Sequence, residues 1–344
     1  MSKYIFREFS FNDADYERCV AIHNAVWPDD HDTVESMKHN DEKRNKQYLN
    51  QRWMIETTDP AIQATTDGQA IGCVWTGESD WSYQPGKYHF GFNIDPAIKT
   101  VENKTVDDII YGQGQLAEKI HDFLMDFLNQ RDPKPVLLTT NGREDRTEYT
   151  QYLEANGFKM VMREAESELE VMEFDPTPFL SSVEKAKANG IQIYSLPELQ
   201  AMDEDWKPKL YDVDIAALLD VPHPGEFTPR PIEEWEKMFT HPDFLAESWF
   251  VAVHDGQYVG VTNLWDNKPN PQKIYVGLTG VRRDYRRKGI ATAVKLRAID
   301  YAQKRGCTRM ATENEENNPM YQINLRLGFK PTPGWLSYHK EIAA

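Results

Sequence analysis

Cysteine is scarce in this sequence of 344 residues. Its three cysteines, Cys19, Cys73 and Cys307, are odd in number and far apart in the chain. This pattern disfavours a disulfide framework and predicts reduced, partly buried thiols. None of the three belongs to a metal-ligand pair, and the nine histidines show no zinc-binding spacing. We therefore expect no metal cofactor.

Long apolar runs are missing as well. No stretch approaches the ~20 residues that a membrane-spanning helix needs. The amino terminus has charges inside its only apolar stretch, so it does not resemble a secretory signal. These absences predict a soluble, cytoplasmic protein with no membrane partner.

Basic residues are outnumbered in this chain. Against 55 Asp and Glu there are 39 Lys and Arg, which gives a formal net charge of -16. Such a charge is a poor basis for holding a phosphate backbone and a suitable one for attracting cations. Nucleic acid is therefore not expected as a partner.

The residues that are abundant favour a folded protein of two domains. Hydrophobic residues make up 40% of the chain and aromatic residues 12%, which is enough to bury a core in each half. The length also exceeds the size at which a single hydrophobic core keeps growing.

An internal repeat supports this division. Each half contains, in the same order, an Asp-Gly-Gln turn, a strand-like run, a glycine-containing turn that opens a helix, and a Gly-Phe pair. The landmarks are 67–69, 89–94, 112–114 and 157–158 in the first half, and 255–257, 275–281, 289–291 and 328–329 in the second. Pro176 and Pro178 interrupt any ladder or helix between the halves. We expect a domain at 1–174, a linker at 175–190 that includes a helical connector, and a domain at 191–344.

A cluster of positive charge stands out in the second half. Five of the seven residues from Arg282 to Lys288 are basic, in a chain that is otherwise acidic. The pattern predicts a buried strand over 273–281, a loop, and a helix from Gly289 to Arg305. A helix amino terminus offers free N–H groups and the positive end of the helix dipole, and a glycine lets the backbone approach an anion closely. The sequence therefore predicts a phosphate or pyrophosphate site at this turn.

These residues resemble the GNAT superfamily of N-acetyltransferases. Arg286-Arg287-Lys288-Gly289-Ile290-Ala291 matches that family's R/Q-x-x-G-x-G/A signature. Thr279-Gly280-Val281 lies where the family pairs its fourth strand with the pantetheine arm of the cofactor. Asn317 and Leu327-Gly328-Phe329 match the asparagine after the fifth strand and the end of the last helix. A P-loop and a dinucleotide-binding turn fit less well, because the lysine-serine ending and the further glycines are missing.

The resemblance implies a fold class, a co-substrate and a set of binding residues. The fold is α/β (α+β), with two GNAT-like domains that each have a mixed, mostly antiparallel central sheet flanked by helices. Acetyl-CoA is the implied co-substrate. The residues expected to bind it are Thr279, Gly280, Val281, Arg286, Arg287, Lys288, Gly289, Ile290, Ala291, Thr292, Asn317 and Asn324.

The first half departs from the family pattern. Ile109 stands where the family has Arg or Gln, and Asp107 and Asp108 just before it would repel a pyrophosphate. Leu153 stands where the family has tyrosine. We therefore expect a tandem protein whose first half is degenerate and does not bind acyl-CoA.

The catalytic groups are less evident. The family mechanism is direct attack of an amine on the thioester in a ternary complex, with a backbone N–H near 279–281 as donor to the oxyanion. Asn324 stands where the family has the tyrosine that protonates the departing thiolate, and an amide can donate a hydrogen bond but no proton. Tyr321 precedes it by three positions and is an alternative acid. Asp220 and Glu226, in a loop before the second strand, are candidates for the base.

The predicted function is acetyl-CoA-dependent acetylation of the amine of a small, cationic molecule. Two alternatives stay open: a non-catalytic acyl-CoA or ligand-binding protein, which the Asn324 substitution motivates, and an acetyltransferase for protein lysines or amino termini. The expected assembly is a monomer or a homodimer.

Overall fold

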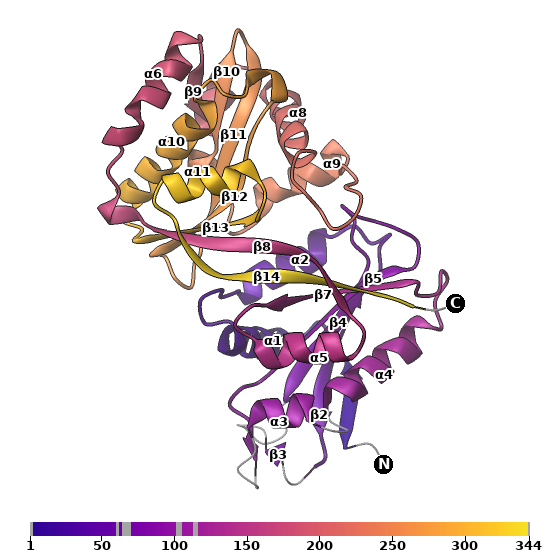
Figure 1. The fold of residues 1–344 in the computed structure, drawn as a ribbon. Coiled ribbons are helices and arrows are strands. Elements are labelled where there is room, and N and C mark those ends of the chain that lie inside the picture. Colours follow the sequence, from indigo (N-terminus) through magenta and orange to yellow (C-terminus); the bar gives the residue numbers. More distant parts are fainter. Residues whose placement is uncertain (1–2, 60–61, 64–69, 101–104, 113–115, 343–344) are drawn as a thin grey trace. The chain divides into compact units, whose positions relative to one another are not determined.

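The computed structural model describes residues 3–59, 62–63, 70–100, 105–112 and 116–342. Residues 67–69 and 113–114, which the repeat assigns to two turns of the first half, lie outside the described residues. The chain forms two compact units (Figure 1): Met1–Met162 together with Leu336–Ala344, and Arg163–Trp335. Each unit is built around hydrogen-bonded strands.

The first unit contains a sheet of strand order β1-β2-β4-β5-β7. Its neighbours are antiparallel except β5 and β7, which are parallel. The strands are β1 (Tyr4–Glu8), β2 (Asn50–Thr57), β4 (Gly72–Gly77), β5 (Lys87–Ile94) and β7 (Leu137–Arg143). A separate pair joins β3 (Ile62–Gln63) to β6 (Lys99–Thr100).

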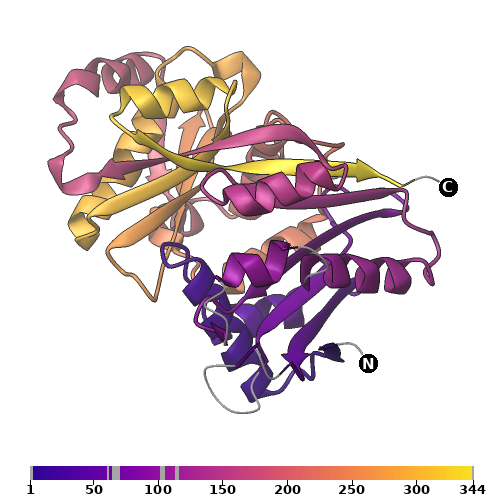
Figure 2. The ribbon, with the colours of Figure 1, turned by 60° about the horizontal axis from the view of Figure 1, so that its bottom comes forward.

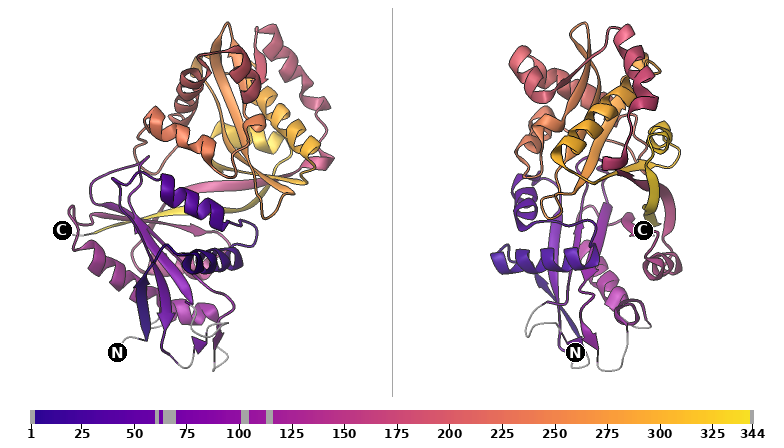
Figure 3. Two further views of the ribbon diagram at one scale, coloured as in Figure 1. Left: turned by 180° about the vertical axis from the view of Figure 1, so that it is seen from behind. Right: turned by 90° about the vertical axis from the view of Figure 1, so that its left-hand side faces the viewer.

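Helices cover both faces of this sheet. Successive side chains of a strand point to opposite faces, so each face has residues that pack against helices. On β2, Trp53 contacts Phe123 and Phe127 of α4, whereas the next residue, Met54, packs in a cluster with Tyr16 of α1. Figure 3 shows the two groups of helices on opposite sides of the strands. The helices are α1 (Asp13–Val26), α2 (Val34–Lys43), α3 (Val106–Tyr111), α4 (Leu116–Leu128) and α5 (Thr147–Ala155).

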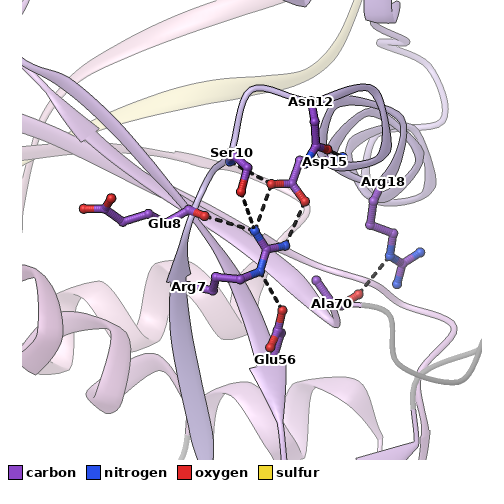
Figure 4. Close-up of polar contacts among 8 residues, drawn as sticks. All are labelled: Arg7, Glu8, Ser10, Asn12, Asp15, Arg18, Glu56 and Ala70. Atoms are coloured by element: carbon purple, nitrogen blue, oxygen red, sulfur yellow. Dashed lines mark hydrogen bonds and ion pairs between the residues drawn. The ribbon is translucent and has the colours of Figure 1, made fainter.

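An ion-pair network fixes the passage from β1 into α1 (Figure 4). The Arg7 guanidinium donates to both oxygens of Asp15, at 2.9 and 2.7 Å, and to Glu56 Oε1 of β2 at 2.8 Å. The Ser10 N–H donates to Asp15 at 2.8 Å, and Asn12 caps the helix by accepting from the Asp15 N–H. The Asp15 carboxylate therefore accepts from both Arg7 and Ser10, and its pKa is lowered mainly by the hydrogen bond from Arg7.

The second unit repeats the same topology. Its strand order is β8-β13-β12-β11-β10-β9, in which β12 and β13 are parallel and the other neighbours are antiparallel. The strands are β9 (Gln192–Ser195), β10 (Phe250–His254), β11 (Gln257–Trp265), β12 (Lys273–Val281) and β13 (Arg309–Glu315). The order β9 to β13 matches β1-β2-β4-β5-β7 in pairing and direction. The predicted fold class and internal repeat are thus confirmed.

Glycines punctuate the second unit where the sequence predicts turns. Asp255 and Gly256, both with positive φ, form the turn from β10 to β11. Gly289 and Gly306, each with φ of 83°, cap the two ends of α10. The α-helices are α6 (Leu180–Ala188), α7 (Leu196–Met202), α8 (Trp206–Leu218), α9 (Ile232–Trp235), α10 (Ile290–Arg305) and α11 (Pro319–Arg326). The 3-10 turns are η1 (Val171–Glu173), η2 (Thr177–Phe179), η3 (Glu236–Thr240), η4 (Ala246–Ser248) and η5 (Arg283–Tyr285).

Two long strands change unit along their length. Strand β8 (Lys159–Glu170) enters the second unit at Arg163, where it pairs with β13. Strand β14 (Lys330–Glu341) joins the first unit from Leu336 onward, beside β7. The expected linker at 175–190 forms η2 and α6, within the second unit.

Candidate functional site

The site begins where two parallel strands part. Strand β12 pairs with β13 over Lys273 to Tyr275 only, whereas it pairs with β11 as far as Val281. Among the residues that the structure describes, the backbone groups of β12 beyond Tyr275 that face away from β11 therefore have no strand partner. An open strand edge of this kind can take an extended ligand as an additional strand.

A bulge interrupts β12 next to this open edge. The register with β11 shifts between Thr262 and Leu264, so that two residues of β12, Gly277 and Leu278, oppose Asn263. The Leu278 N–H donates to Asn263 Oδ1 at 3.0 Å. A Cβ at Gly277 would overlap Asn263 Oδ1 and the Trp265 indole, so only glycine fits at this point. The pairing of β4 with β5 in the first unit runs without such a shift.

The turn from β12 into α10 has the shape of an anion cradle. Arg287 has a positive φ of 61° and Gly289 one of 83°, both rare for residues with a side chain. Gly289 also lies against the carbonyl of Ser182, which a Cβ would overlap. The first helical hydrogen bond is donated by the Ala293 N–H, so among the described residues nothing accepts from the N–H groups of 290–292. These free N–H groups lie at the amino terminus of α10, which is the positive end of the helix dipole, and both features favour an anion.

Asp220 organises the arginines of the turn. Its carboxylate accepts from Arg283 Nε at 2.8 Å and also pairs with Arg286, whose Nε donates to the Val281 carbonyl. Both oxygens of Asp220 are therefore occupied by guanidinium groups, which leaves little capacity to accept a proton from a substrate. This geometry suits a residue that positions arginines better than it suits a base.

A cavity of about 620 Å³ opens beside the turn, within the usual range for small-molecule sites. It gathers many of the predicted residues: Asp220, Thr279, Gly280, Val281, Arg286, Arg287, Gly289, Ile290, Ala291 and Thr292. Gly280 is also required here, because Ala217 of α8 packs directly against it. Sequence reasoning missed the residues that α6 and its approach contribute, Phe179, Ser182 and Lys185, and those from α11 with its N-cap, Asn318, Pro319, Met320, Ile323, Arg326 and Leu327.

Other predicted residues lie outside the cavity lining. Lys288 places its ammonium 4.4 Å from the centre of the Tyr285 ring, and Asn317 donates to Glu315 at 2.8 Å. Glu226 is an exposed loop residue. Neither Tyr321 nor Asn324 is in the lining.

Helix α11 presents one face to the cavity. Met320, Ile323 and Leu327 recur at helical spacing on that face, and Asn324 is rotated from Ile323 by about 100°. Asn324 is fully buried and its Nδ2 donates to Asn314 Oδ1 of β13 at 2.6 Å. Its own Oδ1 is buried without a hydrogen-bond partner among the described residues. In this arrangement Asn324 braces α11 on β13.

Aromatic residues cover the sheet on the α8 side. Trp235, Phe239 and Trp249 form edge contacts with centroids 4.9 to 6.1 Å apart. Asp214 of α8 is buried among them, and Trp235 Nε1 donates to its Oδ2 at 2.7 Å. Burial raises the pKa of Asp214 to about 6.

Side chains of the first unit occupy the place that corresponds to the cavity. Strands β5 and β7 also part after three paired residues. Tyr149 of α5 fills that gap, with its ring 5.5 Å from Phe92 of β5 and its hydroxyl 2.9 Å from Thr140 of β7. Tyr111 packs against Tyr149 and Tyr152, and burial raises the pKa of these hydroxyls. The run from Ile109 to Tyr111, expected as part of a turn, is helical in α3.

Two further observations concern the described part of the chain only. No group of three or more His, Cys, Asp or Glu side chains there could hold a metal ion. None of its helices is long and apolar enough to cross a membrane.

A comparison with protein families gives a match within the second half. Residues 213–329 match the model of the acetyltransferase (GNAT) family. That range contains the bulge, the turn from β12 into α10, and α11. A comparison with curated protein sequences finds no match.

Solved structures match the fold over the whole chain. A tandem GNAT protein from the clavulanic acid biosynthesis pathway is 14% identical, with a TM-score of 0.70 and 99% of each chain covered. A GCN5-related N-acetyltransferase from Sphaerobacter thermophilus is 16% identical, with a TM-score of 0.67 and coverage of 100% of this chain and 97% of that one. A glucosamine N-acetyltransferase region of a fungal multi-domain β-N-acetylglucosaminidase is 13% identical, with a TM-score of 0.65 and coverage of 99% and 38%. At these identities the likeness establishes a tandem GNAT fold.

Proposed function

We propose, from the match of residues 213–329 to the acetyltransferase (GNAT) family, that the second unit transfers the acetyl group of acetyl-CoA to the amine of a small cationic molecule. The observation that supports this most strongly is the cavity beside the α10 turn. It combines unpaired N–H donors, arginine side chains and an open strand edge in one place. A pyrophosphate and an extended amide-containing arm need those three features.

The residues present fit acetyl-CoA at the level of charge and space. Gly280 and Gly289 allow Ala217 of α8 and the Ser182 carbonyl of α6 to approach the turn and strand closely. Arg287 makes no ion pair with a described carboxylate, so it is available to a phosphate, and Arg286 is held at the cavity by Asp220. The bulge at Gly277 and Leu278 would then lie about four residues, or roughly 13 Å, along β12 from the turn.

The acceptor is proposed from charge. A net charge of -16 attracts cations. The aromatic cluster on the α8 side is buried core and lies outside the cavity lining, so it takes no part in this proposal. The tandem neighbour from a biosynthetic pathway and the glucosamine N-acetyltransferase region are compatible with a small acceptor.

Direct attack requires the amine to lose a proton and the thiolate to be stabilised. Glu226 is the freer of the two candidate bases, because Asp220 is already bound by two arginines. Asn324 would have to exchange its bond with Asn314 to reach a thiolate, and Tyr321 would have to turn toward the cavity. We propose further that the first unit binds no acyl-CoA, since Tyr149 fills the gap between β5 and β7.

Isothermal titration with acetyl-CoA tests the binding part of the proposal. We expect one site per chain, and a loss of affinity of at least about tenfold in Gly289→Ala, where a Cβ would overlap Ser182. Gly306→Ala is the matched control: it has the same φ, lies at the other end of α10 and meets no neighbour within 4 Å. Both variants bear the ~1–2 kcal/mol cost of a left-handed alanine. Equal affinities in the two variants, or two sites per chain, would contradict the proposal.

A second candidate function is a non-catalytic acyl-CoA-binding protein, which the buried and bonded Asn324 favours. The two functions differ in turnover. Release of free CoA thiol from acetyl-CoA, followed with a thiol reagent across a panel of small amines, tests for catalysis. Amine-dependent release that disappears in Gly289→Ala supports the enzyme, whereas binding without release for every amine supports the binder.

A further inference from the structure

One wall of the cavity comes from outside the turn that defines the family. Phe179 at the end of η2, together with Ser182 and Lys185 of α6, lines it. Their spacing of three residues places them on one side of this segment. Helix α6 packs alongside α10, as Figures 1 and 2 show.

The position of this wall relative to the turn is defined by a backbone contact. The Ser182 carbonyl lies against Gly289, so α6 borders the amino-terminal end of α10. The open edge of β12 and Ala217 of α8 form another part of the lining. A ligand whose pyrophosphate sits at the turn and whose arm follows β12 must place its nucleotide end against another part of the lining, which α6 and α11 supply. The contact of the Ser182 carbonyl with Gly289 brings α6 next to the turn.

The charge of this wall is unbalanced. The Lys185 ammonium is exposed and makes no ion pair or hydrogen bond with any residue that the structure describes. Asp220 is the acidic residue of the lining, and Arg283 and Arg286 already bind it. Arg326 of α11, on another part of the lining, is a cation that also has no carboxylate partner among the described side chains. An anion distinct from the pyrophosphate would be attracted here.

The wall also contains a stacking surface. Phe179 is half-buried, and its ring stacks on Phe174 with centroids 5.8 Å apart and planes 10° from parallel. It is also part of the cavity lining. A purine stacked on such a ring gains binding energy through its flat face.

We propose that Phe179 and Lys185 form a nucleotide subsite that holds the adenine ring and the 3′-phosphate of acetyl-CoA. This inference rests on the proposed function, because it assumes that the pyrophosphate lies at the Gly289 turn. The segment that joins the two halves of the repeat then takes part in choosing the co-substrate. Lys185 acts as a specificity-determining residue and takes no part in the acetyl transfer.

The test compares acetyl-CoA with its 3′-dephospho analogue by isothermal titration. We expect the wild-type protein to bind acetyl-CoA about tenfold more tightly, and this preference to decrease as salt is raised. Lys185→Met should bind both ligands with the wild-type affinity for the dephospho analogue. Lys187→Met, exposed on the same helix and outside the cavity lining, should keep the full preference.

A separate binding measurement tests the role of Phe179 in the proposed subsite. Phe179→Leu should weaken the binding of adenosine 3′,5′-bisphosphate and of the dephospho analogue, while Lys185→Met should weaken only the former. Thermal melting without ligand checks that each variant folds. Equal wild-type affinity for acetyl-CoA and its dephospho analogue, or an equal loss of both in Lys185→Met, would refute the subsite. Failure of the wild-type protein to bind either acetyl-CoA or its analogue would instead refute the proposed function.

Discussion

Lys295 should make the second unit more stable in mild alkali than in mild acid. The residue lies in the middle of α10 with 3% of its surface exposed, and it makes no ion pair with a described carboxylate. Its ammonium lies over the Phe329 ring, 5.8 Å from the centroid. Burial without a counter-ion lowers the pKa of Lys295 from 10.5 to about 7.

The direction of the effect follows from the protons bound in each state. Between pH 7 and 10.5 the unfolded chain keeps the Lys295 proton while the folded protein has released it. Unfolding then takes up a proton, so the free energy of unfolding rises with pH. With a folded pKa of about 7, the gain from pH 6 to pH 9 is roughly 2.5 kcal/mol.

Urea unfolding at pH 6, 7, 8 and 9 measures this gain, with Lys295→Met as the variant. Methionine keeps an unbranched chain of similar length and removes the charge. We expect the variant to be more stable than wild type at pH 6, and its advantage to shrink by roughly 2.5 kcal/mol by pH 9. Contributions from other groups cancel in the difference between the two proteins.

Lys304→Met is the control, because this lysine lies on the same helix with 75% of its side chain exposed. The free energy of unfolding of Lys304→Met should change with pH in the same way as that of the wild-type protein. If the difference in free energy of unfolding between Lys295→Met and the wild-type protein is constant from pH 6 to pH 9, then burial does not lower the pKa of Lys295 as proposed.

Two further predictions concern single contacts. Asp15→Asn should lower the free energy of unfolding of the first unit by about 1–3 kcal/mol at pH 7, because it weakens the bonds from Arg7 and Ser10. The pKa of Asp15 is lowered in the folded state, so the difference from wild type should persist above pH 3.8 and diminish as the pH falls further. A difference that is constant into acid contradicts this account; urea unfolding over that range measures it. Gly277→Ala should cost the second unit about 1–3 kcal/mol in the same assay, because its Cβ meets Asn263 and Trp265. Unchanged stability would mean that the bulge accommodates a side chain.

Local signals account for the parts of the fold that could be predicted. Strand β12, the glycine caps of α10 and the turn before β11 each depend on a few consecutive residues, such as Asp255-Gly256. The parting of β12 from β13 follows from the family resemblance but from no residue type. Lys185 and Phe179 gave no signal, because a helix in a connecting segment does not indicate what it packs against. Their place in the cavity depends on tertiary contacts.

In the candidate site, too, some residues could be predicted from neighbouring residues and others depend on tertiary contacts. Gly289 and Arg286 were predicted from charge and spacing, and the structure brings both to one cavity. The pairing of Asp220 with two arginines and the burial of Asn324 depend on groups 63 and 10 residues away in sequence. Helical periodicity in 319–327 could have indicated Met320, Ile323 and Leu327 as one face.

The path of β14 constrains how the protein can be made. In the first unit the Ile342 N–H donates to the Val136 carbonyl, and β7 is bordered by residues of β14, which follow Arg163–Trp335 in the chain from Leu336 onward. During synthesis, β7 therefore keeps an open edge while the whole second unit emerges. An early domain with an unpaired edge is exposed to pairing with other nascent chains. Cutting the gene between the repeats would make that state permanent, and supplying residues 330–342 as a separate peptide should close the edge.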